Sequence, residues 1–160
     1  MVILKWVAIA IALLGGLAVA AGQFGLLSGR APGDLGVRDG RLKPPSATEN
    51  SVSSQAALFP DHPQRRYAEI APLALRGSGA ETLTRLRALV ETMPGARVES
   101  AQADYLYATF TTPLMKYVDD VEFWFDPAAR VVHVRSASRI GRGDLGLNRK
   151  RVEAIRSALA

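Results

Sequence analysis

The chain contains 160 residues, of which 48% are hydrophobic, and it carries a formal net charge of +5. This length gives room for one domain of ordinary size plus a tail or a tether. Cysteine is absent, which excludes a disulfide framework, a catalytic thiol and a thiolate metal site. The basic residues are spread along the chain. Proteins that bind nucleic acid usually gather them on one face, beside aromatic or helical elements that contact the bases, so this pattern argues against nucleic acid as a partner.

The first predicted element is an apolar helix. Residues 6–27 read WVAIAIALLGGLAVAAGQFGLL, with Gln23 as the only strongly polar side chain. A helix that spans a bilayer needs about 20 apolar residues, so this run is long enough. The alternative is a cleaved signal peptide, with Lys5 as its charged n-region, residues 6–17 as its apolar core and Ala18-Val19-Ala20 as a small-residue cleavage site. Because the apolar run continues past that site, a retained single-pass anchor within residues 1–29 is favoured, with residues 3–27 in the membrane.

Two signals conflict on which side of the membrane the domain lies. Four basic residues, Arg30, Arg38, Arg41 and Lys43, follow the apolar run closely, and the positive-inside rule places such a flank in the cytoplasm. The tail that precedes the run is very short, which is typical of an exported signal-anchor. We expect export, with the domain in the periplasm.

Residues 30–64 are rich in Gly, Pro, Ser, Asp and Arg and show no sustained period of two or 3.6. Prolines at positions 32, 44, 45, 60 and 63 prevent long regular elements. We therefore expect a linker that becomes an extended wrap near residues 42–55. The folded domain is expected over residues 65–160.

The domain is predicted to begin with an edge strand over residues 67–75, because Pro72 could not donate a hydrogen bond in a central strand. Ser78 and Glu81 then match a capping box at the start of a helix. The following residues place an apolar stripe on one face and leave Arg85 and Glu91 to water. The stripe consists of Leu83, Leu86, Leu89, Val90 and Met93. Pro94-Gly95 ends this helix.

Strands are expected over residues 97–103, 105–111, 118–125 and 131–138, where β-branched and aromatic residues are common. If Phe125 pairs with Val132 across the last hairpin, the register sets Glu122 opposite Arg135 and Trp124 opposite His133. A final helix over residues 147–159 would bury Val152, Ile155 and Leu159. The fold class is therefore α+β, with an antiparallel sheet of about four to five strands and two helices on one face, preceded by the hydrophobic helix.

The most unusual stretch runs from the last strand across three glycines into the final helix. Such a turn can present backbone N–H groups to an anion, and arginines can add charge-assisted hydrogen bonds. The candidate ligand-binding residues are Arg135, Ser136, Ser138, Arg139, Asp144, Asn148 and Arg149. A structural role is favoured by the frequency of caps and ion pairs: Asp144 would cap the helix and pair with an arginine. Cations early in a helix, as at residues 149–151, oppose the macrodipole unless an acidic residue compensates.

A second candidate is the acidic cluster of Asp119, Asp120 and Glu122. Asp120 and Glu122 share a strand face, which could support general acid/base chemistry. An ion-paired sheet face is the favoured interpretation, since Glu122 already has Arg135 as a partner. Neither histidine has a second histidine at ligand spacing, and no nucleophile elbow or nucleotide loop is present. We expect no catalytic residue, no metal and no cofactor.

Several blocks resemble an uncharacterised bacterial family catalogued as domain of unknown function 1499. They are Leu42-Lys43-Pro44-Pro45, Asn50-Ser51-Val52-Ser53-Ser54, Val118-Asp119-Asp120-Val121-Glu122-Phe123 and the run over residues 134–151. The resemblance covers roughly residues 40–159. Two positions depart from the family pattern: Ser51 replaces a cysteine, and Arg142-Gly143 replace an aromatic-serine pair. The resemblance supports the fold and brings no established activity, and the loss of the cysteine counts against any role that needs a thiol.

Three hypotheses for function remain. The first is a non-enzymatic, membrane-associated envelope module that binds a partner protein, an anionic small molecule or a lipid headgroup. Its groove would lie between the edge formed by residues 135–144 and the segment 50–55. The second is an enzyme that uses Asp119, Asp120 or Glu122 as acid/base, with Arg139 holding an anionic substrate. The third is a purely structural module without a pocket.

Overall fold

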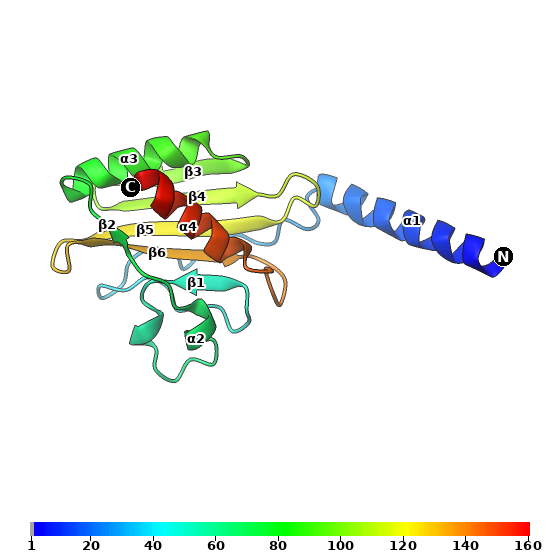
Figure 1. Cartoon of the computed structure of the whole chain (residues 1–160), viewed down its shortest axis with the longest axis horizontal. Helices are drawn as coiled ribbons and strands as arrows, with labels where there is room; N and C mark the ends of the chain where they lie inside the picture. Colours follow the sequence, from blue (N-terminus) through cyan, green and yellow to red (C-terminus); the bar gives the residue numbers. More distant parts are fainter. Residues whose placement is uncertain (1) are drawn as a thin grey trace.

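The computed structural model describes residues 2–160. The chain begins with the apolar helix α1 (Val2–Gln23), which projects away from a six-stranded open sheet (Figure 1). Among residues 2–160, α1 is the one helix long and apolar enough to be a membrane anchor or a signal sequence. Its side chains are exposed up to Ala18, and the helix meets the domain only near its C-terminal end.

The sheet is antiparallel and has the order β1-β6-β5-β4-β3. β1 and β2 pair with different stretches of β6, β1 with residues 135–137 and β2 with residues 131–132. The strands are β1 (Ser51–Ser53), β2 (Leu73–Ala74), β3 (Ala96–Ala101), β4 (Tyr105–Thr111), β5 (Val118–Asp126) and β6 (Val131–Ser138). Two short helical turns, η1 (Ala56–Leu58) and α2 (Arg65–Ala68), follow β1. The predicted α+β class is confirmed, and the sheet gains a short strand from the segment expected to be a wrap.

The predicted hairpin register is confirmed. Phe125 pairs with Val132, Glu122 with Arg135 and Trp124 with His133. The alternation of Val121, Phe123 and Phe125 along β5 favours this register, because a slip of one residue would move these apolar side chains to the opposite face.

The helices α3 (Gly79–Thr92) and α4 (Leu147–Leu159) cover one face of the sheet. The predicted capping box is present: Ser78 Oγ accepts from the Glu81 N–H at 3.2 Å, and Glu81 Oε2 accepts from the Ser78 N–H at 2.7 Å. Leu86, Phe123 and Ile155 are fully buried in the core between the helices and the sheet. Burial of these side chains, at about 1.5–3 kcal/mol each, fixes α3 and α4 on this face.

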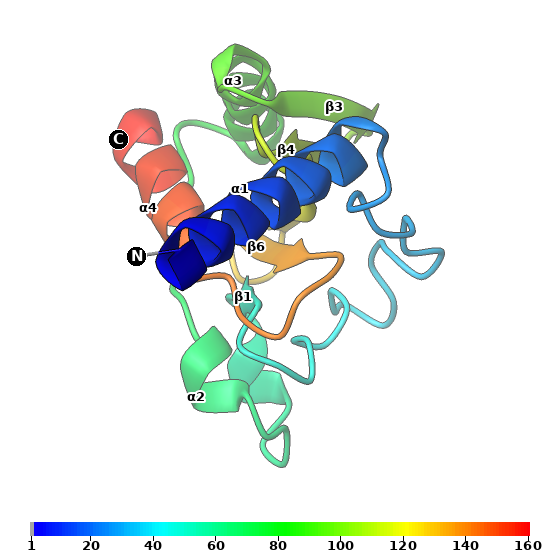
Figure 2. The same ribbon diagram turned by 90° about the vertical axis from the view of Figure 1, so that its right-hand side faces the viewer.

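The opposite face of the sheet is covered by residues 30–50, which carry no long element. Figure 2 shows the sheet between the two helices on one side and this extended segment on the other. Leu42 is buried there against Tyr105 and Trp124. Gln55 holds the segment in place, because its side-chain oxygen accepts from the Leu42 N–H at 2.8 Å and its amide donates to the Gly40 carbonyl at 3.0 Å.

The prediction of an edge strand over residues 67–75 is wrong in extent. Residues Arg65–Ala68 form a helical turn, and only Leu73–Ala74 pair with β6. The polar groups of the intervening backbone bind elsewhere: Arg156 donates to the carbonyls of Pro72 and Ala71 at 2.6 Å each. The tertiary contact with α4 therefore replaces the ladder that the apolar pattern suggested.

The outer strand β3 contains an irregularity. Its pairing with β4 shifts between Val98 and Ser100, which is a β-bulge at Glu99. Glu99 accepts from the Thr109 hydroxyl at 2.8 Å and lies 3.5 Å from Arg97. The free edge of the sheet is therefore bent and charged.

Candidate functional site

A basic cavity lies between residues 30–47 and the sheet, at the end where β6 leaves the sheet. Its volume is about 320 Å³. Four of its lining side chains are cationic and one is a carboxylate. The lining residues are Arg30, Pro32, Lys43, Pro45, Ser46, Ala47, Asp120, Arg135, Ala137, Ser138 and Arg139. The cavity therefore joins residues 30–47, which follow α1, to β5 and β6, which lie about a hundred residues later in the chain.

Arg135 is the most deeply buried cation of the basic cavity, with 3% of its surface exposed. Its Nε donates to the Pro44 carbonyl at 3.1 Å. Its terminal nitrogen lies 3.7 Å from Glu122 Oε2, which is too long for a hydrogen bond. Within residues 2–160 the guanidinium makes no other hydrogen bond, so its terminal N–H groups remain available. Burial lowers the pKa of Arg135, while the Glu122 carboxylate opposes this shift.

Glu122 is fully buried beside Arg135. Its Oε1 accepts from the Tyr105 hydroxyl at 2.8 Å and from the Gly36 N–H at 2.7 Å. Its Oε2 finds no hydrogen-bond partner within residues 2–160. Burial and the adjacent Glu122 carboxylate raise the pKa of Tyr105 above its ordinary value. The predicted pair of Arg135 and Glu122 is thus present, but the two buried side chains do not form a hydrogen bond with each other.

Arg139 and Asp120 form a closed unit at the mouth of the basic cavity. The Arg139 Nε lies 3.0 and 3.1 Å from the two Asp120 oxygens, and a terminal nitrogen donates to Oδ1 at 2.8 Å. Tyr107 donates its hydroxyl to the same oxygen at 2.6 Å. Burial together with this hydrogen bond raises the pKa of Tyr107 to about 12. Asp120 is therefore occupied by two donors.

The three acidic residues do not form one cluster. Asp120 and Glu122 face residues 30–50, whereas Asp119 faces α4 and pairs with Arg151 at 2.5 Å. Arg151 also lies over the Phe110 ring, 4.6 Å from its centroid. The acidic compensation expected for the basic run early in α4 is therefore supplied to Arg151 by Asp119. Within residues 2–160, no three potential metal ligands come together.

The turn between β6 and α4 is organised by Asp144. Its carboxylate accepts from the backbone N–H groups of Gly146 and Asn148 at 2.9 Å each, and from the Tyr67 hydroxyl at 2.7 Å. Burial opposes ionisation, but the hydrogen bonds from Tyr67 and the two N–H groups hold the pKa of Asp144 below its ordinary value. The Asp144 carboxylate therefore binds the first turn of α4 from outside the helix, whose N-cap residue is Gly146. Its other partners are the Tyr67 hydroxyl and the Asn148 side-chain amide rather than an arginine.

Four backbone donors at the C-terminal end of this turn have partners inside the chain. The Asp144 N–H donates to the Glu49 carbonyl at 3.1 Å, and the Leu147 N–H donates to the Asp144 carbonyl at 3.0 Å. Together with the Gly146 and Asn148 N–H groups that bind Asp144, they account for four of the five N–H groups from Asp144 to Asn148. An anion at the start of α4 would have to displace these intramolecular hydrogen bonds.

The seven predicted ligand residues separate into three groups. Arg135, Ser138 and Arg139 line the basic cavity. Ser136, Asp144 and Asn148 belong to a buried network on the α4 face, in which the Ser136 hydroxyl donates to Asn148 Oδ1 at 2.5 Å. Arg149 does not line the basic cavity and donates to the Tyr67 carbonyl at 2.5 Å. Sequence reasoning missed Arg30 and Lys43 as cavity residues, because the irregular segment that holds them has no periodicity to indicate a facing side.

The groove expected between residues 135–144 and residues 50–55 does not exist. Ser51 pairs with Ala137 and Ser53 with Arg135, so β1 is hydrogen-bonded directly to β6. Ser51, at the position of the family cysteine, is fully buried and accepts from the Ser46 N–H at 2.8 Å. The opening lies instead beside residues 43–47.

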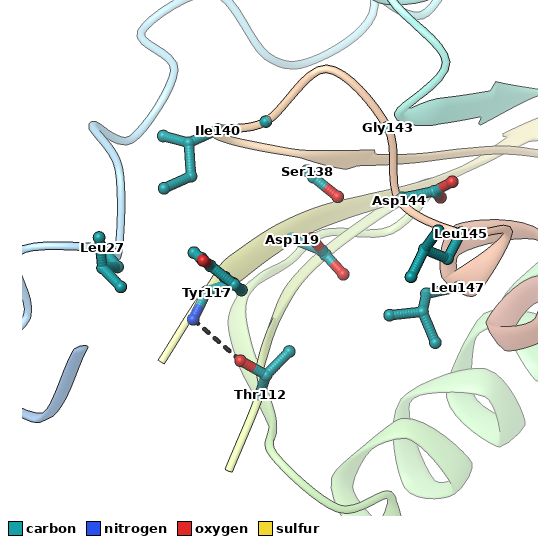
Figure 3. A pocket seen from close by; sticks show the side chains of 11 residues that line it. Leu27, Thr112, Tyr117, Asp119, Ser138, Ile140, Gly143, Asp144, Leu145 and Leu147 are labelled. Carbon is teal, nitrogen blue, oxygen red and sulfur yellow. Dashed lines mark hydrogen bonds between the residues drawn. The ribbon is translucent and has the colours of Figure 1, made fainter. Parts of the chain in front are cut away.

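A second cavity, the apolar cavity, lies at the same end of the sheet and on the α4 face. Its volume is about 320 Å³ and its lining is mainly apolar. Figure 3 shows Leu27 on one side of it, Tyr117 and Ile140 next to it, and Leu145 and Leu147 on the other side. Asp119 and Asp144 also line this cavity, and both carboxylates are bound to partners described above.

Fold and site together define a small α+β domain that follows an apolar N-terminal helix and encloses buried, incompletely paired charges. Residues 41–159 match the family described as "Protein of unknown function (DUF1499)". The chain belongs to this family, which confirms the resemblance. Comparisons with curated proteins and with solved structures find no match.

Proposed function

We propose that this protein is a membrane-anchored, non-catalytic binding module whose basic cavity holds a small anionic group, either a carboxylate or a phosphate. The observation that carries this proposal is Arg135, a buried arginine with only its Nε hydrogen-bonded. Its terminal nitrogens face the basic cavity and have little contact with water, since only 3% of Arg135 is exposed, and a poorly solvated charge is costly. An anion in the basic cavity would remove this cost by accepting two N–H donors at once.

The surrounding charges support the same ligand class. Arg30 is exposed at the rim and makes no ion pair within residues 2–160. Lys43 pairs with Asp34 at 2.6 Å across a partly exposed contact, which is weak in water. Both cations lie in the segment that covers the sheet, so an anion bound between them and Arg135 would also hold that segment in place.

The acid/base alternative is less well supported. Asp120 and Arg139 do line one cavity, as that alternative requires, but they bind each other in a bidentate pair. A catalytic base needs a free lone pair directed at the substrate proton, and a substrate-binding arginine needs free donors. The purely structural alternative expects no pocket, whereas the chain has two cavities of about 320 Å³.

The membrane anchor is supported by the length of α1. Its 22 residues extend about 33 Å at 1.5 Å per residue, slightly more than the hydrocarbon core of about 30 Å. Its exposed apolar side chains require a nonpolar environment. On this proposal the helix is retained, and the domain lies in the periplasm of a bacterial cell.

The anion site is tested by calorimetric titration of the full-length chain in non-ionic detergent with inorganic phosphate and with acetate. We expect one of these anions to bind and Arg135→Lys to weaken its binding by about tenfold, because an ammonium cannot offer two parallel donors. Arg87→Lys is the matched control, since Arg87 lies on the exposed face of α3 and pairs only with Glu91.

Arg30→Gln provides a second variant, in which no buried side chain is altered. We expect it to weaken binding severalfold while the folded domain remains intact, because Arg30 is exposed. Binding that is unchanged in both Arg135→Lys and Arg30→Gln would place the anion elsewhere. Failure of the unaltered chain to bind either anion would refute the proposal.

A further inference from the structure

The C-terminal end of α1 is packed directly against the loop between β4 and β5. Gln23 donates its side-chain amide to the Leu114 carbonyl at 2.8 Å. Gly22 is buried at this contact, where a Cβ would lie 2.5 Å from the Met115 carbonyl oxygen. The domain therefore follows the helix without a free spacer, and this loop lies at the level of the last turn of α1.

The same end of the domain exposes large apolar side chains from separate parts of the chain. Leu145 is 93% exposed and Leu114 is 58% exposed. Others in this region are Phe24, Leu26, Tyr117, Ile140 and Leu147. Leu27 and Tyr117 line the apolar cavity together with Leu145, so that cavity belongs to this apolar end. Exposed apolar side chains gathered at one end of a domain are typical of an interaction surface.

Backbone conformation strengthens the case for Leu145. Its φ is 52°, in the left-handed region that costs a residue with a Cβ roughly 1–2 kcal/mol. Asp144 and Gly146 on either side are fixed by the cap, which projects the leucine outward into solvent. An exposed leucine held in an unfavourable backbone conformation is better explained by contact with an apolar phase than by folding of the domain.

The charges around this surface are suited to lipid headgroups. The loop between β4 and β5 contains Lys116 as its one charged residue. In the turn before α4, Arg142 is exposed, whereas the Asp144 carboxylate is buried and accepts a hydrogen bond from the Asn148 N–H. The charges of these loops that reach solvent are thus positive, with Arg142 exposed and Lys116 half-buried, as in proteins that bind anionic membrane surfaces.

We infer that this end of the domain docks on the bilayer that α1 enters, with Leu114 and Leu145 below the headgroups and with Lys116 and Arg142 among them. The inference rests on the proposed role of α1 as a membrane span and does not depend on the anion site at Arg135. Docking fixes the distance and tilt of the domain relative to the membrane, because helix and loops then contact the lipid together.

The absence of cysteine makes the inference directly testable with single nitroxide labels. The full chain is reconstituted in vesicles of phosphatidylcholine and phosphatidylglycerol with labels at Leu114→Cys, Leu145→Cys, Leu13→Cys or Ala129→Cys. Leu13 lies in the middle of α1. Ala129 is exposed in the turn between β5 and β6, at the end of the sheet opposite α1, and serves as the matched control. Collision with oxygen and with a water-soluble nickel complex then reports the depth of each label.

We expect the labels at positions 114 and 145 to collide more with oxygen than with nickel, and the label at 129 to show the reverse. A label at 145 that is as accessible to nickel as the label at 129, while the label at 13 is shielded, would overturn docking and leave the anchor intact. A label at 13 that is accessible to nickel would overturn the anchor, and docking with it.

Discussion

At the scale of single residues, buried charge is the main feature of this domain. Arg135, Glu122, Asp120 and Asp119 are each nearly or fully buried. Breaking a buried pair by removing one partner is strongly destabilising, whereas the intact pair contributes little net stability. The Arg135 terminal nitrogen and Glu122 Oε2 are 3.7 Å apart, too far for a hydrogen bond. Stability alone therefore does not account for this pair.

Asp144 gives a prediction about stability and pH. Asp144→Ala is expected to lower the free energy of unfolding by about 1–3 kcal/mol near neutral pH, because the N–H groups of Gly146 and Asn148 and the Tyr67 hydroxyl lose their acceptor. Urea unfolding followed by circular dichroism measures this change. Asp61→Ala, at an exposed position, is the control and should have little effect.

The pH dependence of this contribution follows from the lowered pKa of Asp144. A carboxyl whose folded pKa is depressed adds stability that is fully present above its unfolded pKa of about 3.9 and is lost as the pH falls through the folded value. The difference between the unaltered chain and Asp144→Ala should therefore be constant near neutral pH and shrink below about pH 4. A difference that grows on acidification would contradict this account.

At the scale of elements, α3 begins at a position where only glycine fits. A Cβ on Gly79 would lie 2.3 Å from the Phe125 ring. Gly79→Ala should therefore destabilise the domain by about 1–3 kcal/mol through overpacking, although alanine is the better helix former. Thermal unfolding of this variant is compared with Gly33→Ala, since a Cβ at Gly33 meets no atom within 4 Å.

A double variant separates crowding from other effects at this position. If the Phe125 ring is the cause, Gly79→Ala should lose most of its cost when Phe125→Ala is also present. Additive losses in the double variant would show that the glycine is needed for another reason.

Elements with a clear period were predictable from sequence, and those without one were not. The alternation of Val121, Phe123 and Phe125 determined the register of β5 on β6, and the Ser78–Glu81 pair located the start of α3. Residues 30–50 have no period, so their packing on the second face of the sheet could not be predicted. That packing is specified by long-range contacts such as Gly36 with Glu122 and Leu42 with Gln55.

The candidate site was predictable in part for the same reason. Arg135, Ser138 and Arg139 lie on or next to a predicted strand, and all three line the basic cavity. Arg30 and Lys43 come from the irregular segment, and local sequence gives no indication of which strand they approach. Asp144 was expected to pair with an arginine, but its partner Tyr67 lies in a stretch interpreted as a strand.

At the scale of the whole molecule, α1 contributes nothing to the hydrophobic core within residues 2–160. A chain that lacks residues 2–23 should therefore keep a cooperative thermal transition, with a midpoint within about 4 °C of that of the full chain in detergent. Loss of a cooperative transition would show that the contact of Gly22 and Gln23 with the β4–β5 loop is needed for folding. Near-ultraviolet circular dichroism follows this transition in both forms.

The bulge in β3 has a consequence for how copies of the chain behave together. With α1 as the proposed membrane anchor, copies of the chain would meet in two dimensions, where an open strand edge favours edge-to-edge pairing of sheets between molecules. Here the edge is bent at Glu99 and flanked by Arg97. An approaching strand would have to break its ladder at the bend and desolvate both charges. The outer strand therefore opposes fibrillar association while the rest of the sheet remains regular.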